Sequence, residues 1–342
     1  PSPWAPRPGY RRSSALPQTP ADSGPLPGVG QRYQVHRDTQ GTPPSRATTD
    51  PVDGRQQHEQ VASLIPPGIP ARVGAIVTLT AIVLFSLLTV YFFSGLRDDF
   101  GPVVFPSFLL ALIPLGGVLV VTMLLAGVFW YVRWEPRPPG VFTVVTLLVA
   151  FLWGTSVSTL CSLVVNGWVG RVITEAMGDP NAAGVISAPL VEELTNGLGV
   201  LFVFLIWRRT INGTIDGVVY AAFTAAGFAF VENILYFVQG WEYVGTIFVM
   251  RGVLSPFAHL TFTACTGVAI GVSSRRRSQY AWAWMAPVGL VGAILLHATW
   301  NGFVAVNPGV YLLLQFPFYA LCAGLVSWLR WSERRSMRRG LE

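Results

Sequence analysis

Five ionisable side chains of the kinds that hydrolytic enzymes use stand inside strongly apolar stretches of the sequence. Glu192 and Glu193 follow Pro-Leu-Val, Glu232 ends Gly-Phe-Ala-Phe-Val-Glu, His259 ends Ser-Pro-Phe-Ala-His, and His297 begins His-Ala-Thr-Trp-Asn. If these stretches cross a membrane, each ionisable group costs about 2.5 to 3.5 kcal/mol to place there. Groups kept at that cost are candidates for a functional site.

Two or three carboxylates and two imidazoles are suited to activating a water molecule. A glutamate in a low-dielectric pocket can take a proton from water near neutral pH. Imidazole can donate to a developing oxyanion or bind a metal, and the amide of Asn301 can also donate to an oxyanion. His259, His297 and Glu232 together are also a ligand set for catalytic zinc, so a metal-free site and a zinc site both stay open.

The composition indicates what kind of element positions these residues. Apolar types make up 52% of the 342 residues and charged types 12%, with a mean hydropathy of +0.51. Soluble domains carry about 25% charged residues, so a plain soluble fold is excluded. All 23 basic residues are arginine, and the net charge of +6 suits loops beside a membrane rather than a nucleic-acid surface.

Eight apolar runs are long enough to cross a bilayer as helices, which need about 20 residues each. They cover 73–94, 106–132, 141–166, 183–207, 216–238, 251–272, 280–304 and 309–329. With the N-terminus inside, the inner connections and the C-terminal tail hold 12 arginines, and the outer connections hold only Arg97, Arg171 and Arg251. The sequence thus predicts an all-α, polytopic transmembrane helix bundle of about eight spans in the cell membrane, with both termini cytoplasmic.

The chain divides into three parts by composition. Residues 1–70 hold 14 of the 26 prolines and show no hydrophobic period, which predicts a disordered cytoplasmic tail. Residues 71–332 form the predicted transmembrane domain, and 333–342 a basic cytoplasmic tail. Within the domain, strings of small residues predict close packing of helices. These strings are Gly213–Gly217, Ala221–Gly227 and Gly267–Gly271.

The candidate residues share one depth in the predicted spans. Glu192, Glu232, His259 and His297 each lie about 9–14 Å below the outer end of their span, at about 1.5 Å per residue. This predicts one polar pocket in the outer half of the membrane. Adjacent helical residues are about 100° apart, so only one of Glu192 and Glu193 can face the pocket squarely.

Four further polar residues have a structural interpretation. Asp216, at the cytoplasmic start of its span, is expected to cap the helix. Asn233 is expected to bond between helices, and Thr263 to its own helix. Arg251, at an outer end, is expected to interact with lipid headgroups or with Glu242.

The motifs resemble the PrsW family of intramembrane proteases, relatives of the CAAX-processing and bacteriocin-processing glutamic proteases. The resemblance covers about 183–304 and lies in four ordered blocks. These are the pair Glu192-Glu193, the Gly-Phe-Ala-Phe-Val-Glu-Asn block with Glu232 and Asn233, the Pro-Phe-Ala-His block with His259, and the block from His297 to Asn301.

The resemblance implies an endopeptidase that cuts a membrane-anchored protein, for example an anti-sigma factor, on the outer side of the bilayer. It implies that Glu192 is the general base on the attacking water and that Glu193 supports it. His297 and Asn301 would hold water or the oxyanion, and Glu232 and His259 would complete the pocket. The partners implied are the substrate protein and the lipid bilayer, with no nucleic acid.

The chain departs from the family at one position, because the family pattern Glu-Glu-x-x-Lys ends here in Asn196. The missing cation should leave Glu192 costlier to ionise. Two other classes stay open. One is a proton- or ion-coupled transporter, against which the absence of an internal repeat counts. The other is a non-catalytic membrane scaffold.

Overall fold

The computed structural model describes residues 71–133 and 141–307, together with a few isolated positions between 309 and 331. The predicted tails at 1–70 and 333–342, and most of the predicted span 309–329, lie outside the described residues. Every regular element in the described part is a helix, which confirms the all-α prediction.

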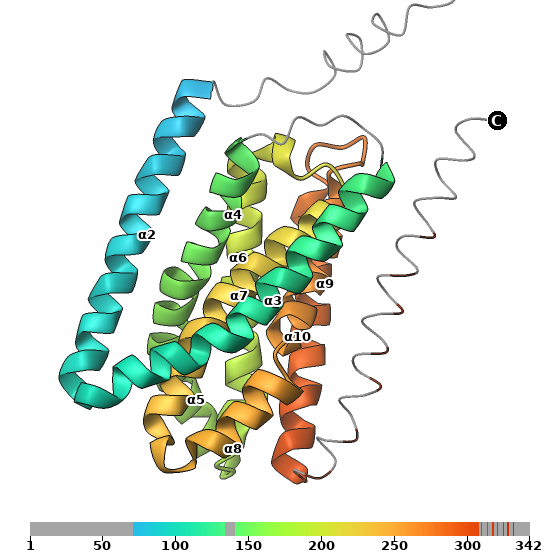
Figure 1. The fold of residues 1–342 in the computed structure, drawn as a ribbon. Coiled ribbons are helices and arrows are strands. Elements are labelled where there is room, and N and C mark those ends of the chain that lie inside the picture. The colour runs from blue at the N-terminus through green and yellow to red at the C-terminus, as the bar shows by residue number, and fades with distance from the viewer. Residues whose placement is uncertain are drawn as a thin grey trace, which may run out of the picture. The chain divides into compact units, whose positions relative to one another are not determined.

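The helices follow one another through short connections (Figure 1). They are α2 (Ala71–Phe100), α3 (Val104–Arg133), α4 (Val141–Trp153), α5 (Thr159–Met177), α6 (Ala188–Ile206), α7 (Thr214–Gln239), α8 (Val244–Phe248), α9 (Ala258–Ser273) and α10 (Trp282–Val306). Three π-helical segments interrupt or extend them: Gly154–Ser158, Ala183–Ser187 and Val249–Leu254.

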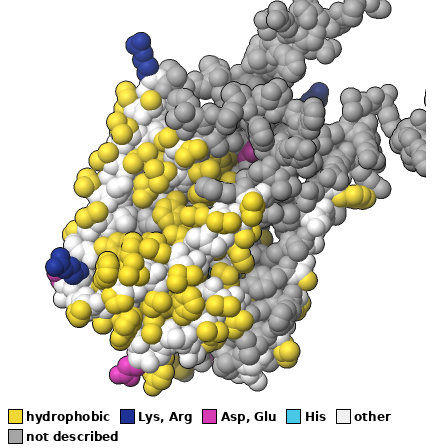
Figure 2. All heavy atoms as spheres, viewed as in Figure 1, with side chains coloured by type: hydrophobic (Ala, Val, Ile, Leu, Met, Phe, Trp, Pro, Cys, Tyr) yellow, Lys and Arg dark blue, Asp and Glu magenta, His cyan; other side chains and the backbone are white. Residues whose placement is uncertain are grey.

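Six helical stretches in the described residues have the length and composition to cross a membrane. They are Arg72–Thr122, Val144–Met177, Ala183–Ile206, Thr214–Gln239, Trp241–Ser273 and Trp282–Val306, and the first contains most of both α2 and α3. Large apolar side chains such as Leu87 and Val288 face outward, and Figure 2 shows a broad hydrophobic surface. The chain is therefore a multi-pass membrane protein; the count of eight spans and the side of the termini stay predictions.

Helix α7 is the most enclosed of the helices, and small residues allow its neighbours to approach it closely. A Cβ atom added at Gly217 would lie 2.0 Å from the carbonyl oxygen of Gly267 on α9. One added at Gly227 would lie 2.1 Å from the carbonyl oxygen of Phe151 on α4. The predicted role of the small-residue strings is confirmed at these contacts.

Asp216 stands in the first turn of α7, as the sequence suggests. Its Oδ2 accepts a hydrogen bond of 2.8 Å from the backbone N–H of Asn212, just before the helix. The carboxylate thus lies at the positive end of the helix dipole, as predicted, and its bond to Asn212 secures the connection before α7; the capping of α7 itself stays a prediction.

The predicted span 251–272 is wrong at its start. A turn at 255–257 separates α9 from the π-helical segment that follows α8, so Arg251 belongs to a different helix from His259. Pro256 explains the break, since proline lacks a backbone donor and disfavours helical geometry in the residue before it.

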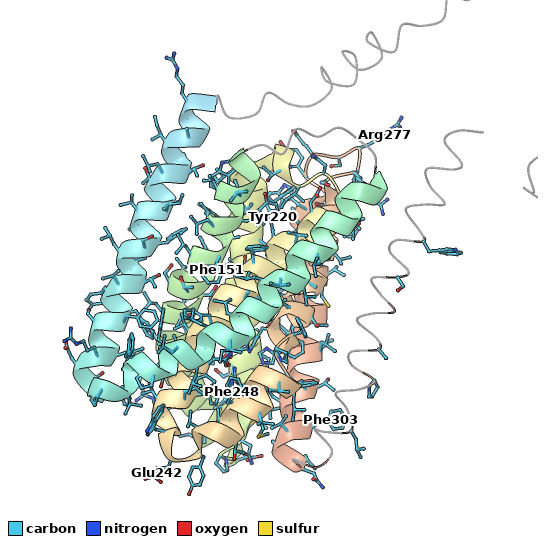
Figure 3. The ribbon with its side chains drawn as sticks, in the orientation of Figure 1. Phe151, Tyr220, Glu242, Phe248, Arg277 and Phe303 are labelled. Carbon is cyan, nitrogen blue, oxygen red and sulfur yellow. The ribbon has the colours of Figure 1, made fainter. Side chains whose placement is uncertain are left out.

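The alternating helix directions bring the candidate residues to one end of the bundle. Glu192 lies near the start of α6 and His259 in the first turn of α9, whereas Glu232 and His297 lie in the second halves of α7 and α10. Glu242 marks this end, and Figure 3 shows Arg277 at the opposite end. The common depth expected from the sequence is therefore observed, and its assignment to the outer leaflet stays a prediction.

The close contact between α7 and α9 predicts a stability difference between two glycine substitutions. Gly217→Ala should lower the free energy of unfolding by about 1–3 kcal/mol, because the added methyl group overlaps the α9 backbone. Gly116→Ala, at an exposed position of α3 with no atom near the added Cβ, should stay within about 1 kcal/mol of wild type. Thermal unfolding in one detergent checks both; equal stability of the two variants would contradict the packing.

Candidate active site

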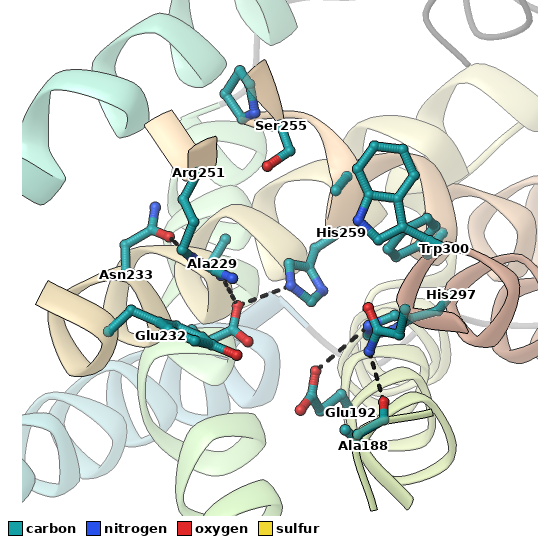
Figure 4. Close-up of a pocket in the computed structure, with 16 residues that line it drawn as sticks. Ala188, Glu192, Ala229, Glu232, Asn233, Arg251, Ser255, His259, His297 and Trp300 are labelled. Atoms are coloured by element: carbon teal, nitrogen blue, oxygen red, sulfur yellow. Dashed lines mark hydrogen bonds and ion pairs between the residues drawn. The ribbon is translucent and has the colours of Figure 1, made fainter. Parts of the chain in front are cut away.

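The predicted site residues converge on one cavity of about 120 Å³ (Figure 4). Helices α6, α7, α9 and α10 and the segment before α9 all contribute to its wall. The polar residues that line it are Glu192, Glu232, Asn233, Arg251, Ser255, His259, His297 and Asn301. The space can hold several water molecules. Of the six residues expected at the site, only Glu193 does not line the cavity.

Glu193 lies behind the cavity wall and is fully buried. Its Oε1 is 3.1 Å from Nδ1 of His297, and its Oε2 accepts a hydrogen bond of 2.8 Å from the hydroxyl of Thr263. Glu192 faces the cavity instead, so the expectation that the two neighbours point different ways is confirmed. The expectation for Thr263 is wrong, because this hydroxyl donates across to α6 rather than to its own helix.

The imidazole of His259 has one occupied and one open nitrogen. Its Nε2 is 2.9 Å from Oε2 of Glu232. Since an ionised carboxylate can only accept, Nε2 carries the proton. Its Nδ1 is buried without a hydrogen-bond partner among the described residues, 3.8 Å from Oε1 of Glu193.

His297 shows the same division. Its Nδ1 donates to Glu193, while its Nε2 lies 4.0 Å from Oε2 of Glu192. The ring stacks on Phe262, with centroids 4.6 Å apart, and meets the ring of His259 edge-on at 5.0 Å. These aromatic contacts hold the ring plane, and the carboxylate fixes which nitrogen is protonated.

Glu192, His259 and His297 are the described group whose geometry suits a metal ion. One donor atom from each lies within 4.8 Å of the others. The fit is supported by the unpartnered buried Nδ1 of His259 and by the carboxylates that hold the other nitrogen of each ring, an arrangement typical of metal-ligating histidines. Glu232, which the sequence analysis grouped with the two histidines, stands outside this set.

Arg251 was not expected at the site. It donates through Nη2 to Oε2 of Glu232 and through Nε to Oδ1 of Asn233, the latter at 2.7 Å. The expectation that Arg251 interacts with lipid headgroups or with Glu242 is therefore wrong. The interhelical bond expected of Asn233 is confirmed, with Arg251 as its donor. Arg251 contacts α7 because the helix breaks between Leu254 and Ala258. The hydropathy of the sequence does not reveal this break.

Asn166 is a second residue that sequence reasoning missed. Its amide Nδ2 donates to Oε1 of Glu192 at 3.2 Å, and its Oδ1 accepts from the hydroxyl of Ser187 at 3.0 Å. Helix α5 therefore contributes to the site, although the sequence analysis placed no site residue on it. An asparagine within an apolar stretch was the available signal.

Two more asparagines lie in this part of the bundle, one at the cavity and one buried. Asn301 lines the cavity, and its Nδ2 donates to the carbonyl oxygen of Gly184 at 2.8 Å, which ties α10 to the π-helical segment before α6. Asn196, which replaces the lysine of the family pattern, is fully buried. Neither of its amide atoms has a hydrogen-bond partner in the described part of the chain.

Comparison with known proteins gives one family and several relatives. A family model described as PrsW family intramembrane metalloprotease matches residues 143–322, more than half of the chain. A protein named Protease PrsW from Clostridioides difficile (strain 630) is 29% identical over 198 residues, which cover 54% of this chain and 76% of that protein.

Two further relatives carry the same name and match shorter segments. The one from Geobacillus kaustophilus is 30% identical over 31% of this chain and 47% of its own length. The one from Oceanobacillus iheyensis is 28% identical over 35% of this chain and 54% of its own length. No solved structure gives a significant match. The family match spans the helices that build the cavity, and this chain belongs to the PrsW family of intramembrane proteases.

Proposed function

We propose that this protein is an endopeptidase that hydrolyses a peptide bond of a membrane-anchored protein at the cavity lined by Glu192, His259 and His297. One observation carries the proposal: a carboxylate and two imidazoles from three helices meet within 4.8 Å at the wall of a cavity inside an apolar bundle. Family membership supports the reaction class.

Glu192 is the proposed proton carrier of the reaction. Its carboxylate lines the cavity, is 7% exposed, and is held through Oε1 by Asn166. The water oxygen attacks the peptide carbonyl carbon while Glu192 takes a proton from that water. The C–N bond then breaks, and the proton passes to the departing nitrogen, so the products are a carboxylic acid and an amine.

In a metal-dependent mode of hydrolysis, Glu192, His259 and His297 would instead hold a divalent cation such as zinc, with Glu192 as a ligand rather than as the proton carrier. Bound there, the cation would acidify a water molecule and polarise the substrate carbonyl. Glu193 and Glu232 contribute by orienting the two imidazoles, which leaves Nε2 of His297 and Nδ1 of His259 free of carboxylate hydrogen bonds.

The substrate class follows from the place of the cavity and from the family. The cavity lies toward the bundle end that the arginine distribution assigns to the outer side. A substrate segment anchored in the membrane can present a peptide bond at that depth, and an anti-sigma factor is the example that the resemblance suggests. Transport is less well supported, since the buried glutamates and histidines among the described residues are Glu192, Glu193, His259 and His297, all at one end.

Removal of the proton carrier should abolish hydrolysis. Glu192→Gln keeps the shape of the side chain but cannot take a proton, so cleavage of a single-pass substrate in liposomes should fall at least about 100-fold. His297→Ala should fall similarly. Asp216→Asn, at the cap of α7, should keep most activity. If Asp216→Asn is as damaging as the other two, or if the wild-type protein moves ions and leaves the substrate intact, the proposed site is wrong.

Metal content separates the two modes of water activation. We expect about one divalent ion per purified chain, less in His259→Ala and His297→Ala, and wild-type content in Asp216→Asn. Chelation should remove cleavage, and added zinc should restore it. Full cleavage by metal-stripped protein, measured together with elemental analysis, would instead establish a metal-free glutamic mechanism.

A further inference from the structure

Arg251 is held at the cavity by three residues of one face of α7. It donates to Glu232 and Asn233, and its guanidinium lies over the ring of Tyr236, 4.0 Å from the centroid. Figure 4 shows the side chain reaching from the segment before α9 toward Glu232. With two bonded donors and a stacked plane, the guanidinium has a single defined orientation.

The segment that carries Arg251 follows α8, whose Phe248 packs against Phe237 of α7 with ring centroids 6.3 Å apart. Neither α8 nor the π-helical segment Val249–Leu254 contains a buried residue. The side chain of Arg251 is nevertheless only 22% exposed. Apolar packing of α8 therefore places the segment beside α7, and the polar contacts with Glu232 and Asn233 orient the arginine at the cavity.

Glu232 connects Arg251 to the proposed hydrolytic group. The same oxygen, Oε2, accepts from Nη2 of Arg251 and lies 2.9 Å from Nε2 of His259. While Glu232 stays ionised it must accept from both, which keeps the proton of His259 on Nε2. The buried Nδ1 then keeps its lone pair and has no hydrogen-bond partner among the described residues.

Arg251 also balances the negative charge of the glutamates at the cavity. Glu192, Glu193 and Glu232 lie in or behind the cavity wall, and Arg251 is the one arginine among the lining residues described. A guanidinium keeps its charge in an apolar site, whereas a lysine can lose it. With Asn196 fully buried and uncharged on the same helix as Glu192, the fixed positive charge at this cavity comes from the segment before α9.

We propose that Arg251 is a positioning residue of the hydrolytic site: it fixes the carboxylate of Glu232 against Nε2 of His259, so that the ring of His259 is held beside Glu192 and His297. This inference rests on the proposed function. Arg251 acts through Glu232, and it requires both the charge and the fork of a guanidinium.

Four variants test the role of Arg251. Arg251→Gln should lower kcat about 10- to 100-fold with little change in KM, and weaken zinc binding by a similar factor, the usual effect of losing an outer partner of a metal-ligating histidine. Arg251→Lys should give an intermediate loss. Glu232→Gln combined with Arg251→Gln should recover part of it, because the glutamine oxygen still accepts from His259 and no carboxylate is left unpaired. Arg171→Gln, at an exposed arginine of α5, is the matched control.

The tautomer of His259 gives a readout that does not depend on turnover. The measurement is an NMR spectrum of metal-free protein with 15N-labelled histidine. The chain has four histidines, and the signal that is missing from His259→Ala is assigned to His259. Wild type should show the Nε2–H form, and Arg251→Gln should lose it. Thermal unfolding of each variant excludes simple loss of the fold.

Two results would overturn the inference. One is an Arg251→Gln variant with wild-type kcat, zinc affinity and tautomer; if its KM is raised, Arg251 contacts the substrate instead. The other is a double variant no better than Arg251→Gln alone. Failure of the proposed function looks different, since the wild-type protein would then leave the substrate intact or Glu192→Gln would keep its cleavage activity.

Discussion

The cost of burying charge in an apolar bundle is the constraint on which the site depends. A buried carboxylate without a partner is strongly unfavourable, so every carboxylate at the cavity has a donor. Glu192 has Asn166, Glu193 has Thr263 and His297, and Glu232 has Arg251 and His259. These pairs satisfy the acids and, at the same time, orient the imidazoles that perform the proposed chemistry. The partners come from four different helices or segments, so the site forms only when the bundle is assembled.

Close packing around α7 provides that assembly. Without a hydrophobic driving force between helices in lipid, association depends on van der Waals contact and on polar bonds between helices. Glycines at the crossings of α7 with α4 and α9 bring the backbones together, and the side chains at the other end of α7 and α9 are thereby set at bonding distance. The small residues of α7 thus bring the neighbouring helices close, and its charged residue then pairs with side chains of those neighbours.

The sequence predicted the helices and the convergence of Glu192, Glu232, His259 and His297, because hydropathy locates spans and alternating direction fixes depth. It did not predict Arg251, Asn166 or the bond of Thr263. Those depend on the rotation of each helix about its axis and on a break at Pro256, and neither leaves a clear mark in hydropathy. The depth of a residue follows from counting residues along its own helix. The residue that it faces depends on how a second helix packs against the first.

The π-helical segments have a consequence for how the site tolerates change. Gly154–Ser158 joins α4 to α5, whereas Ala183–Ser187 begins the helix that α6 continues and Val249–Leu254 ends the helix that α8 begins. Such segments are rare and concentrated at functional sites. Ala183–Ser187 stands directly before the turn that carries Glu192, and Val249–Leu254 contains Arg251. Loss of one residue from the first segment would restore regular winding and turn one side of the junction by about 100° relative to the other. The direction in which Glu192 and Glu193 point, relative to the connection before them, therefore depends on the number of residues in this segment as well as on their types.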